Sequence, residues 1–149
     1  MHALSELPAQ TAANIEYVLC DIDDTVTTQG RLTAQAYQAL QDLHDAGIHV
    51  IPITGRPAGW CDHIARLWPV AAVVGENGAL YMQYDHQRRK MRQRFWTDEP
   101  TRQQNRQRLD ALAQTILCAV PGCALASDQA YRVADLAIDF CEDVDPLPE

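Results

Sequence analysis

Three carboxylates follow an apolar run near the start of this 149-residue chain. In the stretch YVLCDIDDTVT, residues 17–27, the side chains of Asp21, Asp23 and Asp24 come at the end of a segment that is typical of a buried strand. A carboxylate withdrawn from water needs a cation or strong hydrogen-bond donors to compensate its lost hydration. The pattern therefore indicates either a site where a cation binds, or a solvated turn or helix cap.

Two later apolar runs also end in polar residues that could take part in chemistry. Thr54 follows the run at 48–53, and Glu76 follows the run at 70–75. Together with Asp21, they are polar side chains at the ends of three predicted strands. Since the carboxyl ends of parallel strands lie at one edge of a sheet, we expect these side chains to converge there.

Each of these later residues also has a purely structural interpretation. The Thr54 hydroxyl could cap a helix that begins near Pro57. Arg56 could reach a substrate or form a salt bridge with an acidic neighbour. Glu76 and Asn77 could simply shape the turn that leads into the next segment.

The elements that must position these residues alternate between strands and helices. Continuous apolar runs predict strands at 17–22, 48–54 and 70–78. Cap residues, helical spacing and stop signals predict helices at 33–47 and 55–69. This alternation implies right-handed crossovers and a parallel sheet covered by helices, which is a Rossmann-like α/β core.

The pattern changes after residue 80. Residues 79–96 are typical of a strand, a turn and a second strand, which favours a hairpin. A long helix with an apolar stripe is predicted at 98–122, and one or two further strands are expected within 123–140. This second part is therefore predicted to be α+β.

The composition excludes several broad classes. Hydrophobic residues make up 47% and charged residues 21%, which argues against disorder. The formal net charge of −8 disfavours a general affinity for nucleic acid or anionic membranes. The five cysteines are scattered without a CxxC pair, which favours reduced thiols over a zinc cluster or a disulfide framework. Because the sequence shows neither a signal peptide nor a membrane-spanning run, we expect a cytoplasmic protein.

Eight of the 12 basic residues fall between Arg88 and Arg108. A solvated face is our first interpretation of this segment. Some of these arginines could instead line a binding face for an anionic sugar phosphate. Nucleic-acid binding, assisted by the adjacent Phe95 and Trp96, is a third alternative that the net charge disfavours.

The order strand, Asp-x-Asp-x-Thr, crossover, strand and Thr-Gly-Arg resembles the haloacid dehalogenase superfamily of phosphotransferases. The following VVGENGAL is similar to subfamily IIB, whose cap is inserted after the third strand. The stretches ITGRPAGWCDHIARLWPVAAVVGENGA and SDQAYRVADLAIDF are most similar to the trehalose-, sucrose- and mannosylglycerate-phosphate phosphatases.

This resemblance implies a haloacid dehalogenase-like core that carries a partial α+β cap. It divides the chain into a flexible leader at 1–14, the N-terminal part of the core at 15–81 and a partial cap at 82–149. The implied activity is Mg²⁺-dependent hydrolysis of a phosphorylated sugar through an aspartyl-phosphate. We expect a small-molecule partner and no membrane, and the sequence predicts no oligomeric state.

The resemblance also implies a role for each residue of the two motifs. Asp21 would be the nucleophile, and Asp23 would protonate the leaving oxygen and later draw a proton from water. Mg²⁺ would bind the Asp21 carboxylate and the Asp23 backbone carbonyl. Thr54, Gly55 and Arg56 would bind the substrate phosphate.

The sequence departs from the family pattern in two ways. Asp24 stands where the family usually has glycine, a substitution that a turn tolerates. The family also needs a lysine and an acidic pair after the cap, whereas the only lysine here is Lys90, in the predicted hairpin. Asp139 and Asp143 have the spacing of one form of that pair, but no glycine precedes Asp139 and no helix is predicted to follow. We therefore expect a fragment that ends inside the cap and has little phosphatase activity by itself.

These absences favour one alternative function, a catalytically dead ligand-binding or interaction module of the same fold. Nucleic-acid binding through the basic segment is a second alternative. Trp60 and Trp68 lie on one predicted helix and are expected to pack in the core rather than to bind a cofactor.

Overall fold

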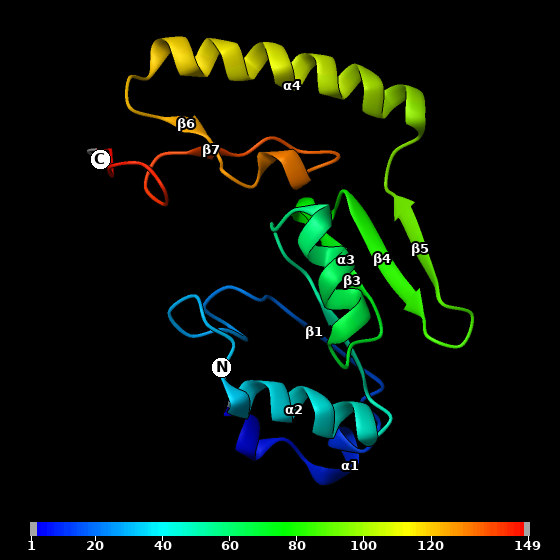
Figure 1. The fold of residues 1–149 in the computed structure, drawn as a ribbon. Helices are drawn as coiled ribbons and strands as arrows, with labels where there is room; N and C mark the ends of the chain where they lie inside the picture. The colour runs from blue at the N-terminus through cyan, green and yellow to red at the C-terminus, as the bar shows by residue number, and fades with distance from the viewer. Residues whose placement is uncertain (1–2, 148–149) are drawn as a thin grey trace.

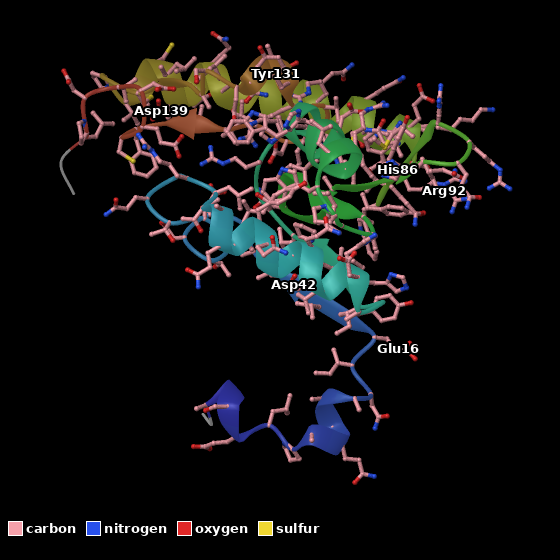
Figure 2. The ribbon with its side chains drawn as sticks, turned by 60° about the horizontal axis from the view of Figure 1, so that its bottom comes forward. Glu16, Asp42, His86, Arg92, Tyr131 and Asp139 are labelled. Atoms are coloured by element: carbon pink, nitrogen blue, oxygen red, sulfur yellow. The ribbon has the colours of Figure 1, made fainter. Side chains whose placement is uncertain are left out.

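The chain runs from a core of strands and helices to a long helix that crosses above it (Figure 1). The computed structural model describes residues 3–147. Figure 1 shows helix α4 (Glu99–Ala119) at one end of the molecule and helix α2 (Ala34–Asp45) toward the other. A short 3₁₀ helix η1 (Leu4–Glu6) and helix α1 (Ala9–Ala12) come first, and Figure 2 shows them projecting away from the rest of the chain. Within residues 3–147, no helix has the length and apolar character that crossing a membrane requires.

The first two strands form a parallel pair. Strand β1 (Tyr17–Cys20) pairs with β2 (His49–Pro52) along its whole length. Strand β3 (Val73–Gly75) is joined to the end of β2 by a parallel bridge between Ile53 and Val74. The predicted parallel α/β core is therefore confirmed, although β3 is shorter than the apolar run that predicted it.

Two helices make the crossovers between these strands. Helix α2 begins after Thr33, whose hydroxyl accepts a first-turn amide at 3.1 Å, and the chain leaves it through Gly47, whose φ of +78° favours glycine. Helix α3 (Ala58–Leu67) connects β2 to β3. The Tyr37 hydroxyl on α2 donates to the Leu67 carbonyl at 3.0 Å, which joins the two helices.

An antiparallel hairpin extends the sheet beyond β3. Strand β4 (Leu80–Asp85) pairs with β3, and β5 (Lys90–Phe95) pairs with β4 along its whole length. The predicted hairpin is therefore present, and its first strand continues the sheet of β3. The domain boundary expected at residue 82 falls inside β4, and the division of the chain into core and cap stays a prediction.

The core lies between α3 and the strands β3 and β4. Trp68 packs against it, whereas Trp60 is 46% exposed, so the prediction that Trp60 is a core residue is wrong. The buried positions of α3 recur at helical spacing, and Trp60 lies outside that stripe. The buried cluster consists of Ile22, Ala58, Cys61, Ile64, Ala65, Val73, Leu80 and Met82.

One face of the parallel pair is exposed. Tyr17 and Leu19 on β1 are 54% and 62% exposed, whereas Val50 on β2 is 1% exposed. Because side chains alternate between the two faces of a strand, only one face of this pair is covered within residues 3–147.

The chain ends in a long helix and a small C-terminal segment. Helix α4 begins after Asp98, whose side chain accepts a first-turn amide at 3.0 Å. Its predicted apolar stripe is only partly buried, since Leu112 is 49% exposed. Two short strands, β6 (Ala124–Leu125) and β7 (Ile138–Asp139), then pair antiparallel, with the 3₁₀ helix η3 (Gln129–Tyr131) between them. Figure 1 shows this segment beneath α4.

Candidate active site

Asp21 lies directly after β1 and lines an open pocket at the carboxyl end of the parallel sheet. This pocket, which we call the Asp21 pocket, has a volume of about 510 Å³ and is also lined by Thr54, Gly55 and Asn77. One carboxylate oxygen of Asp21 accepts the amide of Ile22 at 2.8 Å. The structure thus brings Asp21, Thr54 and Gly55 together at one edge of the sheet.

Thr54 is buried at the end of β2 and stabilises the turn that follows. Its amide donates to the Val74 carbonyl at 2.9 Å, and its Oγ1 accepts the Arg56 amide at 3.0 Å. The hydroxyl therefore supports the turn and does not cap α3, which begins after Pro57 without a side-chain cap. A hydroxyl that accepts one hydrogen bond still has a proton to donate, so Thr54 can bind a phosphoryl oxygen.

Asp23 forms an ion pair with Arg56. Arg56 Nε lies 3.0 Å from Asp23 Oδ2, and Arg56 Nη2 lies 2.9 Å from Asp23 Oδ1. This is the bidentate geometry in which a guanidinium binds a carboxylate most strongly. Of the two roles considered for Arg56, the structure shows the salt bridge, and it does not place Arg56 among the residues of the Asp21 pocket.

The surroundings of Arg56 keep its side chain in place. Its guanidinium lies 5.0 Å from the centre of the Trp60 ring and 3.7 Å from a carboxylate oxygen of Glu142. The hydrogen bond to Asp23 is the main cause that raises the pKa of Arg56 above its ordinary value. Arg56 therefore remains charged and holds the Asp23 carboxylate in one orientation.

A second pocket lies on the Asp23 side of the strand end. This pocket, which we call the aromatic pocket, has a volume of about 590 Å³ and is lined by Asp23 and Arg56. Asp21 and Asp23 border different pockets because the chain turns sharply at Ile22, whose carbonyl accepts the Val26 amide at 3.0 Å. The remaining lining includes Leu32, Gly59, Trp60, His63, Trp68 and Tyr131.

Glu76 was expected either to converge with Asp21 and Thr54 at the sheet edge or to shape a turn, and it is instead a buried anchor between two parts of the chain that does not line the Asp21 pocket. The residue is 1% exposed, and its Oε1 accepts the amides of Ala58 and Val133, both at 2.9 Å. Its Oε2 accepts the amides of Ala134 and Asp135 at 2.7 and 2.9 Å. These donors satisfy the buried carboxylate. No local sequence signal marks this role, because three of the donors lie 57 to 59 residues further along the chain.

Arg132 joins the C-terminal segment to the turn after β2. Its side chain is 8% exposed and pairs with Asp128 and Asp135, both at 3.0 Å. Its Nη1 also donates to the Gly55 carbonyl at 2.9 Å. Burial is the largest influence on Asp135 and raises the pKa of its carboxyl group, although pairing with Arg132 opposes the shift. No local sequence signal marks this role of Arg132, because its partner Gly55 lies 77 residues away.

Asp21 fits the requirements of a magnesium ligand better than the Asp23 side chain does. Mg²⁺ binds proteins through one or two carboxylates and keeps water or phosphate oxygens in its other positions. Asp21 is exposed, whereas both carboxylate oxygens of Asp23 are bound by Arg56. The Asp23 side chain therefore has no carboxylate oxygen free of Arg56 for a metal ion. Across residues 3–147, no group of three or more His, Cys, Asp or Glu side chains is arranged to hold a metal ion.

Asp139 and Asp143 are engaged in a local turn. Oδ1 of Asp139 accepts the amides of Cys141 and Glu142 at 3.0 and 2.8 Å, and Oδ2 accepts the amide of Asp143 at 2.8 Å. These hydrogen bonds lower the pKa of Asp139 below its ordinary value. The Asp143 carboxylate in turn accepts the Ser127 hydroxyl at 2.6 Å. The pair thus has a structural use that accounts for its spacing.

The basic segment 88–108 divides between internal contacts and an exposed strand. Arg102 lies 3.9 Å from the centre of the Phe95 ring, and Arg106 donates to the Asp135 carbonyl at 2.9 Å. Figure 2 shows Arg92 on the hairpin, away from Tyr131. The exposed side chains on one face of β5 are Lys90, Arg92 and Arg94.

The family model of haloacid dehalogenase-like hydrolases matches residues 18–103, which is more than half of the chain. The chain belongs to the haloacid dehalogenase-like hydrolases. The family resemblance drawn from the two motifs is therefore confirmed. No curated protein matches the chain.

Several solved structures share the fold of this haloacid dehalogenase-like chain. The structure of protein 0175 from Thermoplasma acidophilum aligns with this chain with a TM-score of 0.61 at 15% sequence identity. The alignment covers 84% of this chain and 51% of that protein. BT1666 from Bacteroides thetaiotaomicron has a TM-score of 0.50 at 21% identity, over 81% and 41% of the two chains. The subclass IIB sugar phosphatase BT4131 has a TM-score of 0.50 at 16% identity, over 83% and 43%. At these identities the likeness shows the fold alone, and the haloacid dehalogenase-like chain spans about half of these proteins or less.

Proposed function

We propose that this chain carries the nucleophile of a magnesium-dependent phosphate-monoester hydrolase that acts on a sugar phosphate. The observation that carries the proposal is the pocket that Asp21 shares with Thr54 and Gly55. It lies at the carboxyl ends of parallel strands, where α/β proteins bind ligands. Membership of the hydrolase family supports the reaction class, and the sugar phosphatase among the structural neighbours supports the substrate class.

In the proposed reaction, an oxygen of Asp21 attacks phosphorus and the bond from phosphorus to the ester oxygen breaks, which forms an aspartyl-phosphate. In the ion pair with Arg56 the Asp23 carboxylate carries no proton, so in this step the pair opens and Asp23 takes a proton from water. Asp23 then donates that proton to the departing ester oxygen. Asp23 then takes a proton from a water molecule that attacks phosphorus, the bond to Asp21 breaks, and inorganic phosphate leaves. Thr54 hydrogen-bonds the phosphoryl group throughout.

The small residue at position 55 and the charge of a bound metal ion would both suit this pocket to a phosphate ester. A side chain at position 55 would crowd the pocket wall, because a Cβ on Gly55 would lie 3.0 Å from Oδ1 of Asn77. When bound, Mg²⁺ would supply the positive charge that offsets repulsion between the phosphate and Asp21. The Asp21 carboxylate and the Asp23 backbone carbonyl are the groups that would hold it.

Covalent labelling tests the proposal. The chain is incubated with Mg²⁺ and p-nitrophenyl phosphate, quenched in acid and measured by intact mass spectrometry. We expect a mass gain of one phosphoryl group that Asp21→Asn abolishes and that the matched control Asp24→Asn retains. Labelling with little turnover would agree with the low activity expected from the sequence.

Absence of the mass gain would contradict the nucleophile assignment. If inorganic phosphate still shifted the Thr54 amide resonance, that result would favour the alternative of a ligand-binding module without turnover. A salt-dependent gel shift with single-stranded nucleic acid tests the remaining alternative.

A further inference from the structure

The two acids of the first motif border two different pockets, and this separation matches the two sides of a phosphate ester. Asp21 and Thr54 line the Asp21 pocket, whereas Asp23 and Arg56 line the aromatic pocket. A nucleophile must approach phosphorus, and a proton donor must face the oxygen that departs. The aromatic pocket is therefore on the side where the alcohol part of a substrate would lie.

We propose that the aromatic pocket binds the sugar ring of the leaving group, and that Trp60 and Tyr131 select substrates that contain a ring. This inference rests on the proposed function and adds to it the place where the sugar binds. It assigns specificity to α3 and η3, at a distance from the basic face of β5.

The size and lining of the aromatic pocket suit a small organic group. Its volume of about 590 Å³ lies in the range of sites that bind small molecules. Its polar charged pair, Asp23 and Arg56, is confined to one wall because the two side chains bind each other. Much of the remaining lining is aliphatic or aromatic, as in sites that use apolar surface for affinity and a few polar groups for orientation.

Two exposed aromatic side chains line this pocket. Trp60 is 46% exposed and Tyr131 is 59% exposed, so neither is explained by burial in the core. Tyr131 lies against the backbone of α3, since a Cβ built on Gly59 would be 3.0 Å from the Tyr131 Cβ. A sugar ring has an apolar face of C–H groups and a polar edge of hydroxyls, which matches aromatic faces beside a charged pair.

The wall that carries Tyr131 is held in place by buried polar contacts. The next residue, Arg132, pairs with Asp128 and Asp135 and donates to the Gly55 carbonyl. Glu76 accepts the amides of residues 133–135. Because the segment is fixed before ligand arrives, little ordering entropy is lost on binding. Figure 2 shows Tyr131 on η3, in the upper part of the molecule.

A titration followed by ¹⁵N NMR tests the inference on the full chain with Mg²⁺ present. The probes are inorganic phosphate, ethyl phosphate and glucose 6-phosphate. We expect all three to shift the amide resonances of Thr54 and Gly55, and only glucose 6-phosphate to shift the indole resonance of Trp60. Trp96, which is 88% exposed and lies outside the aromatic pocket, provides the unshifted reference. Glucose 6-phosphate should bind about ten-fold more tightly than ethyl phosphate.

Matched variants separate ring recognition from phosphate binding. Trp60→Ala and Tyr131→Ala should each reduce the preference for glucose 6-phosphate over ethyl phosphate to about one-fold. Tyr131→Phe, which keeps the ring, and Trp96→Ala should retain the preference. Thermal melts establish that each variant is folded. The shift of the Trp60 indole resonance is measured on the unmodified chain, so it does not depend on the folding of any variant.

The possible outcomes are distinct. If the Thr54 and Gly55 amides shift but glucose 6-phosphate shows no preference and leaves the Trp60 indole unmoved, the inference is wrong and the proposed function stands. If no probe shifts Thr54 and Gly55, the proposed function fails and the inference fails with it.

Discussion

Arg56 binds both carboxylate oxygens of Asp23, at 2.9 and 3.0 Å, and so joins the turn after β1 to the turn after β2. The pairing turns the Asp23 side chain toward the aromatic pocket, while Asp21 remains at the neighbouring pocket with Thr54. Two carboxylates that are two residues apart are thereby given different surroundings. In the proposed reaction Asp21 is the nucleophile, and Asp23 becomes the proton donor once its ion pair with Arg56 opens.

Replacing Arg56 should weaken this connection between the two turns. We expect Arg56→Ala to lower the free energy of unfolding by about 1 kcal/mol, measured by urea denaturation. Arg66→Ala is the matched control, because Arg66 also binds a carboxylate, Asp62, through two nitrogens at 2.8 and 3.0 Å and lies over an aromatic ring. Arg66 is exposed and the carboxylate that it binds lies on its own helix, so its loss should lower the unfolding midpoint less than the loss of Arg56 does. Equal losses in both variants would contradict the structural role of Arg56.

The role of Asp23 as proton donor predicts a dependence on the leaving group. An aryl ester releases a stable phenolate and needs little general acid catalysis. A sugar alkoxide is a much poorer leaving group and must be protonated as it departs. Asp23→Asn should therefore leave the labelling of Asp21 by p-nitrophenyl phosphate largely intact and slow labelling by glucose 6-phosphate about 100-fold. Rapid-quench mass spectrometry gives both rates. If both substrates slow equally, Asp23 acts on something other than the leaving oxygen.

Removing the charge of Glu76 should destabilise the junction between α3 and the C-terminal segment. Glu76→Gln replaces one acceptor oxygen with a donor group that faces backbone amides, and we expect a loss of about 3 kcal/mol in the free energy of unfolding. Hydrogen exchange should accelerate at residues 133–135, whose amides Glu76 binds. Glu16→Gln, at an exposed position before β1, is the control. The anchor role is contradicted if both variants unfold at the same urea concentration.

The thiol of Cys61 should be unreactive toward alkylating reagents in the folded chain. Burial, assisted by the negative charge of Glu76, raises the pKa of the Cys61 thiol to about 12. Because only the thiolate reacts, iodoacetamide at about pH 8 should modify the exposed Cys118 and Cys141 and spare Cys61. Peptide mass spectrometry measures the three sites, and urea-unfolded chain supplies the fully reactive reference. Modification of Cys61 at the rate of Cys118 would contradict its burial.

The turn after β7 should open in acid. The amides of residues 141–143 lower the pKa of Asp139 in the folded chain, so folding favours its ionised form. That contribution is complete above the ordinary aspartate pKa of about 3.9 and is lost as the pH falls through this value and then through the lower folded value. The amide resonances of Glu142 and Asp143 should therefore move together below about pH 4. In Asp139→Asn this transition should be absent, and its persistence would assign it to another carboxylate.

Much of the fold could be predicted because its signals are local. Apolar runs, cap residues and stop residues indicated the strands at 17–22 and 48–54 and the two crossover helices. Their alternation also implied a parallel sheet and put Asp21 and Thr54 at the same edge. The position of the hairpin in the sheet could not be predicted in this way. A hairpin has the same local sequence pattern whichever neighbouring strand its first strand pairs with.

The sequence by itself determined the order of strands and helices and the reactive side chains that end two of the strands, since both depend on residues close together in the chain. Only the tertiary structure decided that Asp23 pairs with Arg56, that Glu76 is a buried anchor and that Trp60 borders a pocket. Each of these depends on partners tens of residues away, and the free energy of such contacts is set by packing that no local pattern records.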